Sequence, residues 1–500
     1  MGTNLRKSGA MRGVATFLLC VMIALGAGGL RAGSAMAGSK DIEGPYEPTW
    51  ESLKKHPTPK WFHDAKFGIF IHWGVYSVPA WSPKHRYSEW YPHDMYRKGN
   101  PTYEYHKKTY GDHKEFGYKD FIPMWKAENW DPERWAKLFH EVGVRYVVPV
   151  AEHHDGFALW DSELTKWDSV DMGPHRDIIG DLETAVRKYG MKYAPSYHRA
   201  QHWWYYTYDD EFDTMNPKYS GLYTKPHKRS EPPTDEFVQD WKARWEEIRD
   251  KYKPDFMWFD WKWGHPAYQD EAKQMMADFY NLARKWDKDV AITNKTIKNP
   301  PRFPIDVGDL IEMDYLNLDV ISRVKWENPR GIGHSFGYNR NEAPEDYNSV
   351  DELVDGFADI VSKNGNLLLD VGPKADGTIP EVQKERLRGI GEWLDVNGEA
   401  IYGTRPWKTC QEGDIRFTKK GNAVYAICLE WPGKKLQISS MSNISAICPE
   451  SVESVSLLGT EGELKWSRDW RALTINTPGK KPCKHAYVFK VTLGPPRNDP

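Results

Sequence analysis

The fold is decided by the stretch Phe67-Gly68-Ile69-Phe70-Ile71-His72-Trp73, in which an apolar run gives way to a polar side chain. Short runs of this kind recur along the chain and fit strands that are buried on both faces. They lie at residues 146–150, 192–195, 256–259, 290–293, 309–312 and 366–369. Amphipathic segments lie between them, at 132–142, 179–189 and 234–251. This alternation predicts an α/β fold, a (β/α)8-like TIM barrel.

Polar side chains follow these runs at the point where each predicted strand ends. Glu152-His153-His154-Asp155 follow the second run, and His72, His198, Asp260 and Asp314 follow the first, third, fourth and sixth. The active site of such a barrel lies at the carboxyl ends of its strands. We therefore expect these residues to meet in one pocket.

The pattern changes after about residue 405, where short alternating segments are separated by Gly and Pro. This change predicts an antiparallel β-sandwich at 405–500, behind a barrel domain at 38–404. The four cysteines outside the N-terminal segment all fall in this last part, at Cys410, Cys428, Cys448 and Cys483. In an exported protein they can form two disulfides by any of three pairings, or remain free thiols.

The first 37 residues have the pattern of a signal peptide. Arg6, Lys7 and Arg12 precede an apolar run, and Ala35-Met36-Ala37 supplies the small residues of a cleavage site. A membrane anchor is the competing interpretation, but the run is short and Gly-rich. We expect a secreted or periplasmic protein. A net charge of −3 with no polybasic patch argues against nucleic acid as a partner.

Three long motifs carry a resemblance to a known family. They are residues 65–74 (AKFGIFIHWG), 153–157 (HHDGF) and 364–373 (NGNLLLDVGP). Together they resemble glycoside hydrolase family 29, the α-L-fucosidases, over residues 61 to 407. The resemblance implies a retaining glycosidase that removes terminal α-L-fucose from a fucosylated oligosaccharide or glycoconjugate without a cofactor. The chain's 24 tryptophans suit such a substrate, because an indole can cover the apolar face of a sugar.

The resemblance assigns the nucleophile to Asp260, which ends a Trp-x-Asp pattern, although Trp261 stands where many members have glycine. Retaining glycosidases also need a second carboxyl group as general acid/base. Asp314 is our choice, because it lies twelve residues after Arg302, as in relatives. Glu312 is a rival two residues away, and Glu327 is a third candidate for which a structural role is favoured.

The remaining site residues implied by the resemblance hold the sugar. They are His72, Glu89, Trp90, His153, His154, His198 and Arg302. Ser196 stands where the family has a sugar-contacting tyrosine, and His198 is expected on the same side of the strand to replace that contact. Two alternatives remain: a fucose-binding protein without turnover, and a metal-dependent hydrolase that uses His153 and His154. We expect no metal, and the sequence does not indicate an oligomeric state.

Overall fold

The computed structural model describes residues 42–295, 304, 308–312 and 314–497. The predicted signal peptide and Arg302 lie outside the described residues, so both stay predictions. Among the residues that are described, no helix combines the length and the apolar character needed to cross a membrane.

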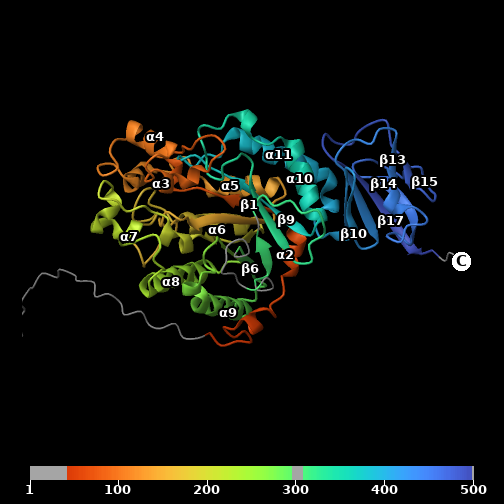
Figure 1. Ribbon diagram of the computed structural model, residues 1–500. Helices are drawn as coiled ribbons and strands as arrows, with labels where there is room; N and C mark the ends of the chain where they lie inside the picture. Colours follow the sequence, from red (N-terminus) through yellow and green to blue (C-terminus); the bar gives the residue numbers. More distant parts are fainter. Residues whose placement is uncertain (1–41, 296–303, 305–307, 313, 498–500) are drawn as a thin grey trace, which may run out of the picture. The chain divides into compact units, whose positions relative to one another are not determined.

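Parallel strands close into a barrel, which confirms the predicted fold class (Figure 1). Strands β3 and β4 are short and share one position between β2 and β5, so the barrel has eight strand positions. β1 pairs with both β2 and β9, which closes the ring. The strands are β1 (Phe67–Ile71), β2 (Tyr146–Glu152), β3 (Lys192–Tyr193), β4 (Ser196–Tyr197), β5 (Phe256–Phe259), β6 (Ala291–Asn294), β7 (Leu310–Glu312), β8 (Trp326–Gly331) and β9 (Gly365–Val371).

The long helices lie between the strands, and most begin at a side chain that caps the first turn. Asp131, Asp177, Thr234 and Ser349 accept hydrogen bonds from backbone N–H groups of α5, α6, α8 and α10, which would otherwise lack partners. The helices are α1 (Trp50–Leu53), α2 (Lys60–Ala65), α3 (Tyr91–Asp94), α4 (Pro101–Thr109), α5 (Pro132–Glu141), α6 (Ile178–Lys188), α7 (Ser220–Tyr223), α8 (Asp235–Tyr252), α9 (Gln269–Lys285), α10 (Val350–Ser362) and α11 (Glu381–Asn397).

Gly68 illustrates how closely the barrel interior is packed. A Cβ atom at this position would lie 2.4 Å from the ring of Tyr146 on the neighbouring strand. The ring can therefore cross β1 only because residue 68 has no side chain. Tyr146 in turn donates a hydrogen bond of 2.6 Å from its hydroxyl to Glu327, deep in the barrel.

The C-terminal part consists of two antiparallel sheets, as predicted. The first has the order β10 (Arg405–Glu412), β11 (Ile415–Lys420), β12 (Ala423–Cys428), β17 (Tyr487–Pro496), β14 (Glu450–Leu457). The second has the order β13 (Lys435–Ile438), β16 (Leu473–Asn476), β15 (Trp466–Arg468). The predicted boundary at 404/405 coincides with the start of β10, but the division into independent domains stays a prediction.

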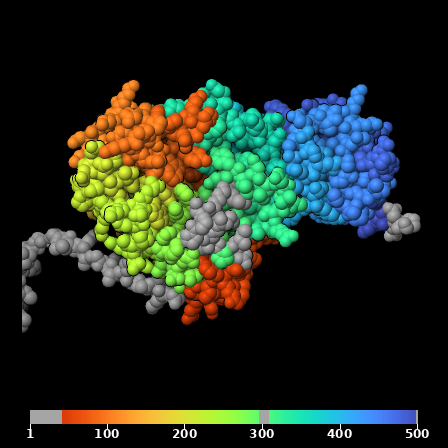
Figure 2. All heavy atoms as spheres, viewed as in Figure 1, coloured from red at the N-terminus to blue at the C-terminus, as the bar shows by residue number. Residues whose placement is uncertain are grey.

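Specific contacts join these sheets to the barrel helices (Figure 2). Arg416 of β11 pairs with Asp359 of α10 at 2.6 Å, and the indole N–H of Trp393 in α11 donates to the carbonyl of Ala486. The four cysteines of this part are free thiols, and three of them are buried. The disulfide alternative is therefore not the one that the structure adopts.

Candidate active site

A cavity of about 340 Å³ opens where the barrel strands end. It brings together most of the residues that the sequence predicted: His72, Glu89, Trp90, His153, His154, His198, Asp260 and Asp314. The predicted rival Glu312 also lines it. Sequence reasoning did not identify the other lining residues, which are Phe70, Tyr87, Trp258, Trp261, Lys295 and Phe336.

Asp260 follows β5 directly, and hydrogen-bond donors surround its carboxylate. Oδ2 lies 3.0 Å from Nε2 of His154 and 3.2 Å from Nδ1 of His198. Oδ1 lies 3.0 Å from the ammonium of Lys295 and accepts from the backbone N–H of Trp261 at 2.8 Å. Burial raises the pKa of Asp260, but Lys295 and the two histidines outweigh it and hold this pKa well below its usual range. The group is therefore a carboxylate at neutral pH.

Lys295 is the functional residue that the sequence analysis missed. Its ammonium lies 3.3 Å from Glu312 and 2.8 Å from Asp314, in addition to its contact with Asp260. One cation, which follows β6, thus joins three carboxyl groups from the ends of β5 and β7, the strands on either side. The signal was available, because Lys295 immediately follows β6 and the ends of barrel strands are where active-site residues lie.

The two acids at the end of β7 differ in exposure. The side chain of Glu312 is fully buried, whereas that of Asp314 is 31% exposed. Burial, and then the charge of Asp314, raise the pKa of Glu312 well above its usual range. Glu312 therefore holds its proton more tightly than a free glutamate, and Asp314 is the one of the two acids that solvent reaches.

Glu327 lies away from the cavity, inside the barrel. It accepts hydrogen bonds from the hydroxyl of Tyr146 at 2.6 Å and from the indole of Trp258 at 3.0 Å. Burial raises its pKa to about 7. These contacts fit the structural role that we expected, because they fix the indole of Trp258, which lines the cavity beside Asp260.

Neutral histidines form one wall of the cavity. Burial lowers the pKa of His72 and of His153 well below the usual range, and that of His198 to about 4. Nδ1 of His72 lies 2.6 Å from Asp370 of β9, which fixes the ring. Nε2 of His198 lies 2.9 Å from the hydroxyl of Ser196. Uncharged imidazoles can both donate and accept hydrogen bonds, as recognition of sugar hydroxyls requires.

Glu89 and Trp90 also line the cavity. Glu89 is buried and accepts from the backbone N–H of Gly337 at 2.8 Å, and burial raises its pKa to about 7. The indole of Trp90 packs with its ring centroid 5.3 Å from that of His154 and 5.4 Å from that of Tyr205. The side chain of Tyr205 is itself buried.

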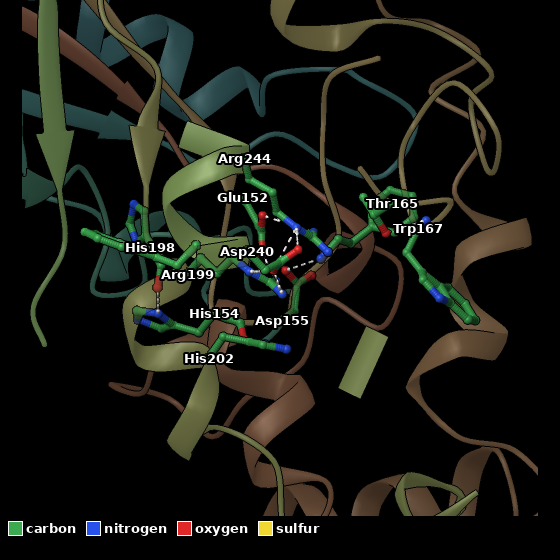
Figure 3. A network of polar contacts seen from close by, with 12 residues as sticks. Glu152, His154, Asp155, Thr165, Trp167, His198, Arg199, His202, Asp240 and Arg244 are labelled. Atoms are coloured by element: carbon green, nitrogen blue, oxygen red, sulfur yellow. Dashed lines mark hydrogen bonds and ion pairs between the residues drawn. The ribbon is translucent and has the colours of Figure 1, made fainter. Parts of the chain in front are cut away.

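A buried ion network holds the two strand ends that carry the histidines (Figure 3). Glu152, the last residue of β2, pairs with Arg199 at 2.6 Å, and Arg199 also binds Asp240 of α8. The backbone N–H of His198 donates to the carbonyl of Glu152 at 3.0 Å. His154 closes the arrangement, with Nδ1 2.9 Å from the carbonyl of His198. The network therefore fixes the donors that face Asp260.

Two sets of three side chains are close enough to hold a metal ion, namely His72, His153 and His198, and His154, His198 and Asp260. Both sets belong to the cavity already described. In the second set, His154 and His198 both contact the carboxylate of Asp260 directly.

Comparisons with known proteins agree over both parts of the chain. Residues 34–399 match the model of the α-L-fucosidase family, and residues 408–492 match that of the α-L-fucosidase C-terminal domain. The human tissue α-L-fucosidase is 34% identical, over 89% of this chain and 92% of that protein. The human plasma α-L-fucosidase is 33% identical, over 89% of this chain and 92% of that protein.

A solved structure has a similar fold. The Thermotoga maritima α-fucosidase in complex with fucose superposes with a TM-score of 0.75 at 38% identity, covering 89% of this chain and all of that one. With the barrel and the carboxylate-lined cavity described above, these matches are sufficient to assign the family. The chain belongs to the α-L-fucosidases.

Proposed function

We propose that the protein hydrolyses terminal α-L-fucosyl residues by double displacement, with Asp260 as nucleophile and Asp314 as general acid/base. The observation that carries this assignment is the cavity itself, where an ionised carboxylate lies at the end of β5 and Lys295 links it to two carboxyl groups at the end of β7. Retaining glycosidases use two carboxyl groups on either side of the scissile bond.

The surroundings of Asp260 support its role as nucleophile. It is ionised, it faces the cavity, and its donors hold it in one orientation. Attack on the anomeric carbon transfers the oxygen's electron pair to that carbon and breaks the bond to the leaving oxygen. The leaving oxygen takes the proton of Asp314. Water, which gives a proton back to Asp314, then attacks the glycosyl ester, releases fucose and regenerates the carboxylate of Asp260. Two inversions give net retention.

Asp314 fits the acid/base role better than its neighbour because of its exposure. A general acid must reach the departing oxygen on the open side of the sugar, and the carboxyl group of Asp314 is partly exposed there. Glu312 is completely buried, and its pKa is raised well above its usual range. We assign to Glu312 the role of a neighbour that donates to Asp314 and supports its proton exchange.

The walls of the cavity provide recognition of the sugar. We propose that His72, Glu89, His153, His154 and His198 bind hydroxyl groups and that Trp90 covers an apolar face. Arg302 stays a proposed contact on the basis of the sequence resemblance.

A direct assay tests the proposal. Purified protein should hydrolyse an aryl α-L-fucoside, and NMR spectra recorded early in the reaction should show α-fucose as the first product. Initial appearance of β-fucose would contradict the double displacement, and absence of hydrolysis would favour a binding protein that lacks turnover.

We also propose that the chain is exported, with residues 1–37 removed as a signal peptide. The charged, apolar and small-residue segments of the N-terminus support this assignment, and one of the relatives is a plasma protein by name. N-terminal sequencing of the mature protein should place its first residue near Gly38. A mature chain that retains Met1 would contradict the proposal.

A further inference from the structure

A second cavity, of about 690 Å³, shares no lining residue with the active site. Its walls come from residues 164–167 after β2, from residues 199–203 after β4, from 218–231 and from the first turns of α8. These segments follow the carboxyl ends of their strands, so the cavity opens at the same end of the barrel as the active site. A glycan bound at one opening can therefore extend toward the other.

One wall of this second cavity is a fixed set of hydrogen-bonding groups. Asp240 accepts from Arg199 at 2.8 Å and from Arg244 at 3.2 Å, and both arginines also pair with Glu152 behind them (Figure 3). The arginine side chains are 4% exposed, whereas that of Asp240 is 30% exposed. Burial raises the pKa of Asp240, but the two arginines outweigh it and lower this pKa. Asp240 thus presents a preorganised acceptor to the cavity.

Another wall carries the half-buried indole of Trp167. Gly221 leaves this ring accessible, because a Cβ atom there would lie 2.7 Å from the indole nitrogen. The second tryptophan of the lining, Trp203, is already covered by the stacked ring of His227, with centroids 3.8 Å apart. Hydroxyl groups complete the lining, at Thr165, Ser220, Thr224 and Thr234.

The charges of this lining are largely compensated. Lys225 pairs with Glu236 at 3.0 Å, and the two arginines are balanced by Asp240 and Glu152. Of the other charged lining residues, Lys166 and Lys218 are positive and Glu231 is negative, which leaves a net charge of about +1. A flat indole beside hydroxyl, carboxylate and guanidinium groups matches a sugar, which has an apolar face and polar edges. Most of the charge is compensated within the lining, which suits an uncharged sugar.

We propose that this cavity is a second carbohydrate-binding site, which holds an uncharged sugar unit of the substrate glycan at a distance from the bond that is cleaved. The proposal rests on the assigned glycosidase function, since it takes the ligand from the same glycan. Binding at two points raises the affinity for long glycans, because the second contact is intramolecular. Small substrates cannot reach both openings, so the second site does not raise their affinity.

The test compares Trp167→Ala with Trp470→Ala, a control at an indole that is 60% exposed and lies in the C-terminal part. For Trp167→Ala we expect KM for fucosylated mucin glycans to rise about tenfold at unchanged kcat, because a central aromatic contact is lost. Both variants should keep the parent rate on an aryl α-L-fucoside. That assay also separates failure of this proposal from failure of the assigned function, since a protein without fucosidase activity would fail it from the start.

Two further measurements keep the proposal falsifiable. Gly221→Val should cover the indole and reproduce the KM effect, while Trp167→Phe should retain most of the affinity. Calorimetry with enzymatically defucosylated mucin glycans, in the presence of saturating free fucose, should detect binding to the parent and not to Trp167→Ala. Equal KM values for parent and Trp167→Ala, or the absence of calorimetric binding to the parent, would overturn the second site.

Discussion

The carboxyl ends of β5 and β7 both supply acids to the same cavity, but they hold them in opposite states. Four hydrogen-bond donors surround Asp260 at the end of β5, and its pKa is depressed. At the end of β7, Glu312 and Asp314 are two acids beside one cation, and the pKa of Glu312 is raised. Donors thus favour the ionised form of the acid at one strand end, while burial and a like charge favour the protonated form of Glu312 at the other.

The largest effect should come from removing the acid of the β5 end. Asp260→Gly should lower kcat for all fucosides by on the order of 10⁴-fold or more, because the covalent intermediate can no longer form. Rates are measured on the purified variant, with its circular dichroism spectrum as the control for folding. Recovery of turnover with azide would support the assignment, whereas near-parent activity without azide would refute it.

The two acids of the β7 end can be separated by the leaving group. Asp314→Ala should slow hydrolysis of natural glycans by about 10²–10³-fold and that of an activated aryl fucoside much less, since a good leaving group needs little protonation. Glu312→Gln is the matched variant, and we expect it to show no such dependence on the leaving group. If the two patterns are exchanged, Glu312 is the acid/base.

Lys295 contacts acids at both strand ends, so its removal should reduce the difference between their pKa values. Lys295→Met removes the main charge that lowers the pKa of Asp260, so this pKa rises and the acid limb of the kcat/KM profile moves to higher pH. We expect a loss of about 10²-fold at neutral pH from the weakened electrostatics. Lys262 lies next to the site but outside the cavity lining, so Lys262→Met should leave the pH profile unchanged. An unmoved acid limb in Lys295→Met would contradict the role of the lysine.

The ion network behind the histidines should have a smaller effect on rate. Glu152→Gln leaves Arg199 and Arg244 with one acid fewer, so we expect a destabilisation of about 3 kcal/mol and roughly a tenfold loss in kcat as the histidine donors shift. Thermal unfolding measures the loss of stability, and steady-state kinetics measure the loss of kcat. Glu152→Asp should recover part of the rate. A stability loss with unchanged kcat would show that the pair does not position the site.

Removal of metal ions with a chelator should leave the enzyme activity unchanged. The histidines beside Asp260 could in principle bind a metal, but the assigned chemistry needs only carboxyl groups. Dialysis against EDTA should therefore leave the rate on an aryl fucoside unchanged. A loss that zinc restores would replace the two-carboxyl mechanism with a metal-dependent one.

The strands of the barrel differ in how far the sequence predicts them and the residues at their ends. Asp260 was identifiable because it ends a continuous apolar run, and such runs form strands buried on both faces. Strand β8 has no such run, since it contains Glu327, Asn328 and Pro329, whose polar groups are paired or buried only through tertiary contacts. The choice between Glu312 and Asp314 depends on exposure, and exposure follows from packing across the barrel.

Lys295 shows what could not be predicted from the sequence. The sequence analysis missed it although it follows a strand, and its contacts depend on three acids that come together only in the closed barrel. The fold class, the position of Asp260 at a strand end and the histidines of the cavity could therefore be predicted from the sequence, whereas the contacts of Lys295 with the three acids could not.

The unpaired cysteines of the C-terminal sheets have a practical consequence. A fold whose four thiols remain free does not need an oxidising compartment or a disulfide isomerase to mature. Heterologous production in the reducing cytosol of a bacterial host, without the first 37 residues, should yield the same folded enzyme as production by export. Purification under reducing conditions would then protect the thiols without any loss of structure.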